Sequence, residues 1–209
     1  MTKDKIIQIF KRFQAVNPTP KGELNSVNPY TFLVAVILSA QATDIGVNKA
    51  TEKLFKVADT PEKMVKLGLK KLKDHIKTIG LYNAKAENVI KMSETLIQKY
   101  SSEVPNTMDN LVGLAGVGRK TANVVLNIIF GQPTIAVDTH VFRVSNRLGI
   151  AKGATVEIIE KKLDKAIPLE FKHHAHHWLI LHGRYICKAR NPNCVECLLA
   201  DLCPSRMKV

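Results

Sequence analysis

Cysteine is absent from the chain before Cys187, and all four cysteines of the 209 residues lie between Cys187 and Cys203. Long apolar runs are also missing: the longest, FLVAVILSA, covers Phe32–Ala40, whereas a membrane-spanning helix needs about 20 residues. The first residues, MTKDKIIQIFKRF, are interrupted by charges and lack the apolar core of a signal peptide. We therefore expect a soluble, cytoplasmic protein in which Phe32–Ala40 forms a buried helix.

Acidic residues are scarce, with 18 Asp and Glu against 31 Lys and Arg, which gives a net charge of +13 and a pI near 9.7. Such an excess favours a polyanionic partner, above all nucleic acid, over a membrane or an acidic protein. Lysine outnumbers arginine 24 to 7, so a solvated surface accounts for part of the excess. Because 45% of the residues are hydrophobic, the chain can bury a core and global disorder is excluded.

The alternation of apolar and polar residues that marks a β-strand is missing too, and helical periodicity dominates. Short breaks rich in Asp, Thr, Pro or Gly separate the helices. The best domain boundary is GQPT at 131–134, with a second candidate at 17–24. The pattern predicts an all-α protein with two helical halves and with helices over residues 3–16, 29–42, 45–57, 61–67, 70–77, 83–100, 108–114, 117–130, 138–148, 156–166 and 168–185.

The cysteines are spaced C-x6-C-x2-C-x5-C, at Cys187, Cys194, Cys197 and Cys203. Four thiols in so short a segment are typical of a metal-ligand set, and a reducing cytosol disfavours disulfides. The thiols suit either a structural zinc ion or a cubane iron–sulfur cluster, and ligand type alone leaves both open. Between the first two cysteines, Lys188 and Arg190 either are solvated or contact a nucleic-acid phosphate.

The stretch GLAGVGRKTA at 113–122 nearly matches the phosphate-binding loop of nucleotide hydrolases, G-x-x-x-x-G-K-[ST]. One extra residue, Arg119, precedes the lysine, and no β-strand precedes the loop. The context is instead helix, glycine turn, helix, in which Gly116 and Gly118 allow close backbone approach. We expect the second helix to begin near Val117 and to present its free amides to an anion such as a DNA phosphodiester.

Lys120 lies in the first turn of that second helix, where the positive end of the helix dipole disfavours a cation. The neighbouring Arg119 adds like-charge repulsion, and both effects favour a neutral amine. A neutral primary amine is a nucleophile that can form a Schiff base. Lys120 is therefore either a surface lysine or a nucleophile, and these residues alone leave the choice open.

Asp138 follows the apolar residues IAV and opens a helix, so we expect it both to cap that helix and to supply a carboxylate near Lys120. The segment HHAHHWLILHG at 173–183 places His173 and His177 four residues apart on one helix. No carboxylate ligand accompanies them, and the apolar residues that follow indicate a buried helix. We therefore interpret these histidines as structural or phosphate-facing groups and not as metal ligands.

Five segments along the chain form a combination that is more specific than any one motif. They are LSAQATD at 38–44, KTIGLYNAKAENV at 77–89, LAGVGRKTANVVLN at 114–127, PTIAVDTHVFRV at 133–144 and HHWLILHGRYIC at 176–187. Together with the cysteine spacing they resemble the endonuclease III family, bacterial DNA glycosylases of the helix-hairpin-helix superfamily. The resemblance runs almost from end to end.

The resemblance implies an all-α, two-lobed fold. A six-helix barrel would cover residues 21–133 and carry the helix-hairpin-helix at about 107–127. The second lobe would combine residues 1–20 with 134–209 and hold a [4Fe–4S] loop at 187–203. DNA would lie across the cleft between the lobes, and we expect the protein to act as a monomer.

The resemblance also implies an activity: removal of oxidised pyrimidines from double-stranded DNA, with cleavage of abasic sites by β-elimination. By motif position, Lys120 matches the nucleophile and Asp138 the essential carboxylate. Gln41 and Leu81 match residues that fill the base stack after a nucleotide is flipped out. Further DNA contacts are expected from Gly116, Gly118, Arg119, Lys188 and Arg190.

One departure from the family pattern lies in the hairpin, where Ala115 stands in place of the usual proline and is expected to loosen the turn. Related adenine-specific glycosylases lack the lysine nucleophile and carry an extra C-terminal domain, so Lys120 and the short chain argue against that activity. The rival hypothesis from another class is a non-catalytic DNA-binding protein with a structural metal. Lys120 distinguishes the two, because only the enzyme needs its amine.

Overall fold

A computed structural model gives the structure of the protein, and residues 1–206 are described. These residues form eleven α-helices and no β-strand, which confirms the all-α prediction. The chain divides into two compact units. The interior unit is Glu23–Phe130, and the terminal unit combines Met1–Gly22 with the residues from Gly131 onward.

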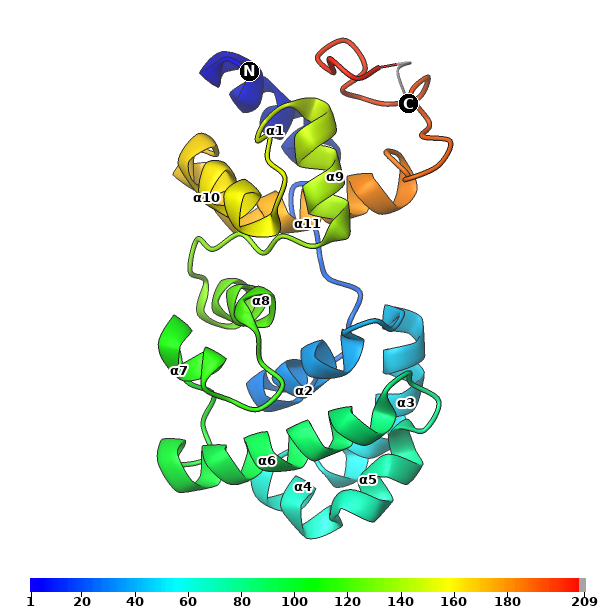
Figure 1. Cartoon of the computed structure of the whole chain (residues 1–209), viewed down its shortest axis with the longest axis vertical. Helices are drawn as coiled ribbons and strands as arrows, with labels where there is room; N and C mark the ends of the chain where they lie inside the picture. Colours follow the sequence, from blue (N-terminus) through cyan, green and yellow to red (C-terminus); the bar gives the residue numbers. More distant parts are fainter. Residues whose placement is uncertain (207–209) are drawn as a thin grey trace. The chain divides into compact units, whose positions relative to one another are not determined.

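The interior unit is built around α2, in which every residue from Tyr30 to Leu38 is buried. The long helix α6 packs against α2, α4 and α5, and α8 packs against α2 and α7 (Figure 1). The helices of this unit are α2 (Pro29–Ser39), α3 (Asp44–Val57), α4 (Pro61–Leu67), α5 (Leu69–Ile76), α6 (Tyr82–Tyr100), α7 (Met108–Val112) and α8 (Arg119–Phe130).

Polar residues determine where these helices begin. Asn28 and Thr31 form a capping box ahead of α2, and Pro29 occupies its first turn, where a missing N–H costs nothing. Threonine side chains accept a backbone N–H at three further starts: Thr43 for α3, Thr60 for α4 and Thr107 for α7. The breaks rich in Thr and Pro are therefore helix starts as much as helix ends.

Helix α2 is shorter than the predicted 29–42, and it ends at Ser39. The backbone turns into the left-handed region at Gln41, with φ of 54°. The Ala42 N–H then donates to the Ser39 carbonyl at 3.0 Å and closes the turn. Gln41 thus lies on an exposed corner between two helices and not on a helix.

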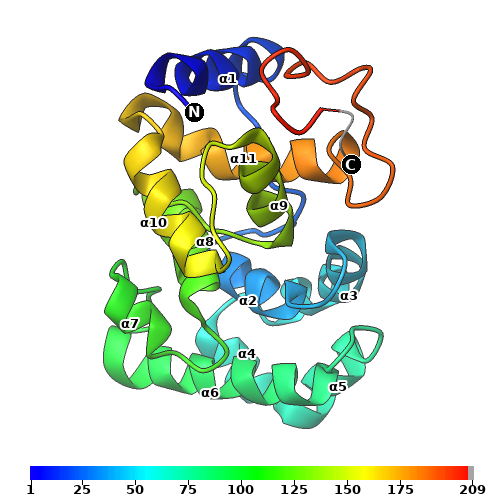
Figure 2. The same cartoon turned by 45° about the horizontal axis from the view of Figure 1, so that its top comes forward.

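The terminal unit has an aromatic core, and its helices are α1 (Lys3–Val16), α9 (Thr139–Leu148), α10 (Val156–Ala166) and α11 (Leu169–Tyr185). Helix α11 packs against α9 and α1 (Figure 2). The rings of Phe10 and Phe171 stack with centroids 5.7 Å apart, and those of Phe13 and Trp178 stack at 6.3 Å. The Trp178 indole also donates to the Asn17 carbonyl at 2.8 Å, so the start of the chain is fastened to α11.

Among residues 1–206, no helix combines the length and the apolar character that crossing a bilayer requires.

Candidate active site and metal centre

The hairpin between α7 and α8 is a tight turn that rests on α6. The Leu114 N–H donates to the Leu111 carbonyl and the Val117 N–H to the Leu114 carbonyl, each at 3.1 Å. Gly116 is left-handed, with φ of +78°, and a Cβ there would lie 2.9 Å from the Cβ of Asn88. Both the backbone conformation and the contact with α6 therefore require glycine at this position.

Gly118 serves a different purpose, because it is not left-handed and a Cβ there would meet no atom within 4 Å. Its backbone faces open space, which leaves room for a ligand to approach. Ala115, in the position of the family's proline, is half-buried, and both hydrogen bonds of the turn are formed with alanine there.

Helix α8 begins at Arg119, two residues after the predicted start at Val117. The Gly118 carbonyl accepts the Ala122 N–H at 2.9 Å, which makes Gly118 the cap of the helix. Lys120 is consequently the second residue of α8, and both it and Arg119 are exposed. The lysine side chain is thus attached to the positive end of a helix, at a place a macromolecule can reach.

Asp138 caps α9 in the terminal unit, as predicted. Its Oδ1 accepts the Val141 N–H at 2.8 Å, directly after the buried run Ile135–Val137. The capping bond fixes the half-buried carboxylate and leaves Oδ2 for a further contact. Lys120 and Asp138 belong to different units, so the geometry of each is defined within its own unit.

Gln41 and Leu81 occupy two strained turns of the interior unit. Both have left-handed backbones, with φ of 54° and 58°, which is unfavourable for a residue with a side chain. A Cβ at Gly80 would lie 3.9 Å from the Gln41 carbonyl oxygen, so the two turns adjoin. Leu81 is 62% exposed, and the interior unit therefore presents a polar and an apolar side chain from one strained corner.

The four cysteines line a single cavity in the terminal unit. Burial raises the pKa of the Cys197 thiol, and the other three sulfurs are near enough to raise it further. Burial likewise raises the pKa of Cys203. As placed, no three His, Cys, Asp or Glu side chains of residues 1–206 meet at the distances of a single metal ion. The chemistry of the donor set, four thiols around one cavity, suits a group that bonds to all four sulfurs.

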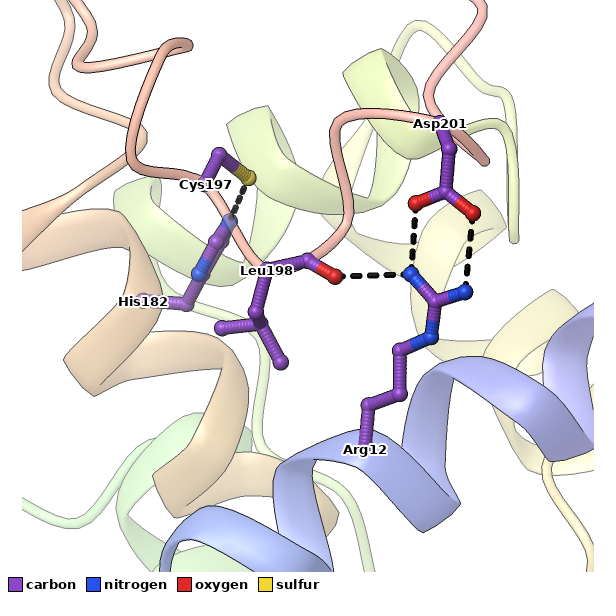
Figure 3. A network of polar contacts seen from close by, with 5 residues as sticks. All are labelled: Arg12, His182, Cys197, Leu198 and Asp201. Carbon is purple, nitrogen blue, oxygen red and sulfur yellow. Dashed lines mark hydrogen bonds and ion pairs between the residues drawn. The ribbon is translucent and has the colours of Figure 1, made fainter.

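Three arginines hold the cysteine segment in place. Arg12 of α1 forms a bidentate ion pair with Asp201, at 2.5 and 2.8 Å, and also donates to the Leu198 carbonyl (Figure 3). The ion pair lowers the pKa of Asp201 to about 2. Arg143 of α9 donates to the carbonyls of Gly183 and Cys187, at 2.8 and 3.1 Å.

Arg147, one turn further along α9, donates to the carbonyls of Lys188 and Ala189 at 2.7 and 3.1 Å, and its guanidinium lies 3.6 Å from Cys187 Sγ. The hydrogen bonds from Arg147 thereby fix the backbone between the first two cysteines. The side chains of Lys188 and Arg190 are exposed, as a phosphate contact would require.

Two family models match the chain. One, described as "HhH-GPD superfamily base excision DNA repair protein", matches residues 34–169, and the other, "Iron-sulfur binding domain of endonuclease III", matches residues 187–203. The chain is 59% identical to endonuclease III of Haemophilus influenzae and 56% identical to that of Escherichia coli, each over 100% of this chain and 99% of the relative.

Among solved structures, the chain is similar to that of a trapped endonuclease III–DNA covalent intermediate, with a TM-score of 0.93, 46% identity and coverage of 100% of this chain and 98% of the other. The chain belongs to the endonuclease III family. It is a DNA-binding glycosylase of base excision repair, and abasic-site lyase activity is typical of the family. The match over residues 187–203 supports an iron–sulfur cluster and gives no support to the zinc alternative.

The histidines of this endonuclease III-family member are mostly structural, as interpreted from the sequence. His176 Nδ1 is hydrogen-bonded to the Ala136 carbonyl at 2.8 Å, and His182 Nε2 lies 3.7 Å from Cys197 Sγ (Figure 3). Burial lowers the pKa of His177 to about 4, so the ring is neutral at pH 7. His173 is exposed and remains available for a phosphate contact.

Sequence reasoning missed the residues that support the site. Asn88 lies against Gly116, and the sequence gave no sign of this contact, because α6 and the hairpin meet only in the folded chain. Arg143 and Arg147 did give a signal. They stand four residues apart on one helix, and such a pair faces one side. The sequence offered no means of deciding that this side faces the cysteine segment.

Proposed function

We propose that this member of the endonuclease III family excises oxidised pyrimidines from double-stranded DNA and then cuts the strand at the abasic site, with Lys120 as the nucleophile. The observation that carries the proposal is an exposed lysine in the first turn of α8, directly after a glycine turn whose backbone is open. An anion bound by that turn would be a DNA phosphate, which brings a sugar within reach of the lysine.

The chemistry needs an amine and not merely a base. Lys120 Nζ attacks C1′ of the damaged nucleotide, the glycosidic C–N bond breaks, and the base leaves with the bonding electrons and takes up a proton. The C1′–O4′ bond then opens, which leaves an iminium between C1′ and Nζ. The iminium acidifies the C2′ proton, whose removal expels the 3′ phosphate and breaks the strand. Water finally hydrolyses the Schiff base and releases the lysine.

Asp138 would stabilise the positive charge that develops on the sugar or help to deprotonate Lys120. The cap of α9 holds one carboxylate oxygen in place and leaves Oδ2 for this role. Because the hydrogen bond from the Val141 N–H already holds the Asp138 side chain, the carboxylate loses little rotamer entropy when it binds a charge. Such a preorganised group is suited to stabilising a developing charge.

Base extrusion is the step for which the strained corner is suited. The damaged base must leave the stack before its sugar can be attacked, and the gap must be filled. We assign that role to Gln41 and Leu81, since both are exposed and held in left-handed turns. The backbone contacts of the DNA would come from the hairpin and the basic loops, through Gly116, Gly118, Arg119, Lys188 and Arg190.

The iron–sulfur group would be a [4Fe–4S] cluster held by Cys187, Cys194, Cys197 and Cys203. When bound, such a cluster ties four points of the loop together through iron–thiolate bonds. Arg12, Arg143 and Arg147 fix the backbone around it, so the basic loop would keep one shape. We further propose that the protein acts as a monomer in the bacterial cytoplasm, where it associates with the DNA.

Borohydride reduction of the iminium tests the proposed function. The wild-type protein should form a covalent complex with DNA that contains an abasic site or an oxidised pyrimidine. Lys120→Gln should lose that complex, whereas Lys91→Gln, which removes an exposed lysine of α6, should keep it. Trapping of normal yield by Lys120→Gln would exclude Lys120 as the nucleophile.

The identity of the metal group is tested on the protein as isolated. A [4Fe–4S] cluster predicts a yellow-brown protein with iron and sulfide in equal amounts. A colourless native protein that carries zinc would contradict this assignment.

A further inference from the structure

Ile45 is an apolar side chain on the exposed side of α3, where a polar side chain would be expected. It lies in the first turn of α3 and is 81% exposed. The buried face of this helix consists of Val47, Ala50, Thr51, Leu54 and Phe55. Ile45 precedes Val47 by two residues, which places it about 200° around the helix, on the opposite side. The other exposed residues of α3 are charged, apart from Val57 at the last position of the helix; they are Lys49, Glu52, Lys53 and Lys56.

Ile45 lies close in the sequence to the turn to which we assign base extrusion. Ile45 follows Gln41 by four residues, and the turn of Gln41 adjoins the turn that carries Leu81. Leu81 is also apolar and 62% exposed. Exposed lysines flank both turns, with Lys49 one helical turn after Ile45 and Lys77 just before the second turn. Ile45 and Leu81, both apolar and exposed, thus belong to two segments whose turns adjoin, and each segment carries an exposed lysine.

Local structure does not account for an isoleucine here. A β-branched side chain has a lower helix propensity than Lys, Glu or Ala, and Thr43 already caps α3. Single exposed apolar residues are common on proteins, but Ile45 stands among charged residues on this side of α3 and beside the turn of Gln41 in the sequence. An amphipathic pattern that is broken without a structural gain indicates a functional position.

The surface chemistry fits an opened DNA duplex. Proteins that unstack DNA insert apolar side chains between base steps, while neighbouring cations hold the phosphates. We propose that Ile45 is a further DNA-opening residue, which packs against the sugar and base edge beside the gap that the extruded nucleotide leaves. The inference rests on the proposed base extrusion and adds to it a contact residue on a second helix, α3.

Substitution of Ile45 tests the inference against a matched control on the same helix. Ile45→Ala should lower the single-turnover rate of excision from a duplex with one oxidised pyrimidine by about fivefold to tenfold, because the apolar contact is lost. Ile45→Val should stay within about twofold of the wild type. Val57→Ala, which truncates a 53% exposed side chain at the other end of α3, should leave the rate unchanged.

Two further readouts separate DNA opening from folding and from chemistry. Because Ile45 is exposed, Ile45→Ala should keep the wild-type thermal midpoint. Its borohydride trapping on a single-stranded abasic oligonucleotide should also match the wild type, since no duplex has to be opened there. A wild-type excision rate on the duplex would overturn the inference. An equal loss on both substrates, or a lower thermal midpoint, would overturn it as well.

A failure of the proposed function can be distinguished from a failure of the role proposed for Ile45. If the wild-type protein can be trapped neither on duplex nor on single-stranded abasic DNA, the lysine chemistry itself is wrong. If the wild type is trapped and Ile45→Ala excises from the duplex at the wild-type rate, only the role of Ile45 is wrong.

Discussion

The interior unit and the terminal unit are each stabilised by a different kind of internal contact. In the interior unit, helices from one continuous stretch of chain, Glu23–Phe130, pack around the buried α2. In the terminal unit, residues from the two ends of the chain meet: Arg12 pairs with Asp201 across 189 residues, and Trp178 bonds to Asn17 across 161. The hairpin with its lysine therefore rests on a scaffold made from one continuous stretch of chain, whereas the cysteine loop depends on contacts between the two ends of the chain.

The largest expected effect comes from the aromatic core of the terminal unit. Phe10 is fully buried and packs against Phe13, Phe171 and Trp178, so Phe10→Ala should cost about 3–5 kcal/mol. Hydrogen exchange should show the loss in α1, α9, α10 and α11, while α2–α8 keep their protection. The reciprocal variant is Leu72→Ala, which should loosen the interior unit alone. Equal loss of protection in both units by either variant would contradict the comparison.

Acid should also act mainly on the terminal unit. Burial lowers the pKa of His177 to about 4, whereas an unfolded histidine titrates near 6.5. Between these values the unfolded chain binds a proton that the native ring does not, so stability falls as the pH falls from about 6.5 to 4. The loss attributable to His177 should reach roughly 2–3 kcal/mol. Unfolding free energies measured across this range provide the check.

Matched histidine variants show which residue causes the loss of stability at acid pH. His177→Gln should weaken the pH dependence but not remove it, because burial also lowers the pKa of His182 to about 4. His75→Gln, in the interior unit, should leave the dependence as in the wild type. A terminal unit whose stability stays constant between pH 6.5 and 4 would show that the buried histidine does not control it.

The hairpin offers a test within the interior unit. Gly116→Ala places a Cβ 2.9 Å from Asn88 in a left-handed backbone, and it should cost about 1–3 kcal/mol and weaken binding of abasic-site DNA. Gly118→Ala meets no atom, so it should cost less than about 1 kcal/mol, the amount expected for alanine at a helix cap. Denaturant unfolding compares the two variants. Equal destabilisation would mean that contact with α6 does not shape the turn.

The smallest effect is a gain in stability at the end of α6. Ser101 is left-handed, with φ of 51°, and Ser101→Gly should raise the unfolding free energy by about 0.5–1 kcal/mol. Ser102 is left-handed too, but its hydroxyl donates to Glu62, so Ser102→Gly should gain less. Thermal midpoints would reveal the order, and a lower midpoint for Ser101→Gly would contradict it.

Prediction from sequence succeeded where a local signal determines the structure. Thr107, Pro29 and Asp138 begin helices because capping and proline rules act within a few residues, and these starts were predicted. The end of α2 was predicted wrongly, since the left-handed turn at Gln41 adjoins Gly80, which lies far along the chain. Contacts such as Asn88 with Gly116 and Arg12 with Asp201 could not be predicted, because they exist only after distant segments pack.

In the candidate site, too, some residues could be predicted from a local signal and others could not. The cysteine spacing indicated a metal site from residue type alone, and the iron–sulfur family match over these residues supports it. For Lys120, helix electrostatics gave a chemical rationale but left a surface lysine equally open. The resemblance to the endonuclease III family made it the candidate nucleophile, and that role remains a prediction.

The most direct measurement locates the sugar after borohydride trapping. The reduced complex of the wild-type protein with abasic DNA is digested, and the lysine that carries the sugar remnant is identified by mass spectrometry. The chain has 24 lysines, so a single modified site is informative. We predict a stable secondary amine on Lys120 and on no other residue. A sugar remnant on another lysine or on the N-terminal amine would contradict the account.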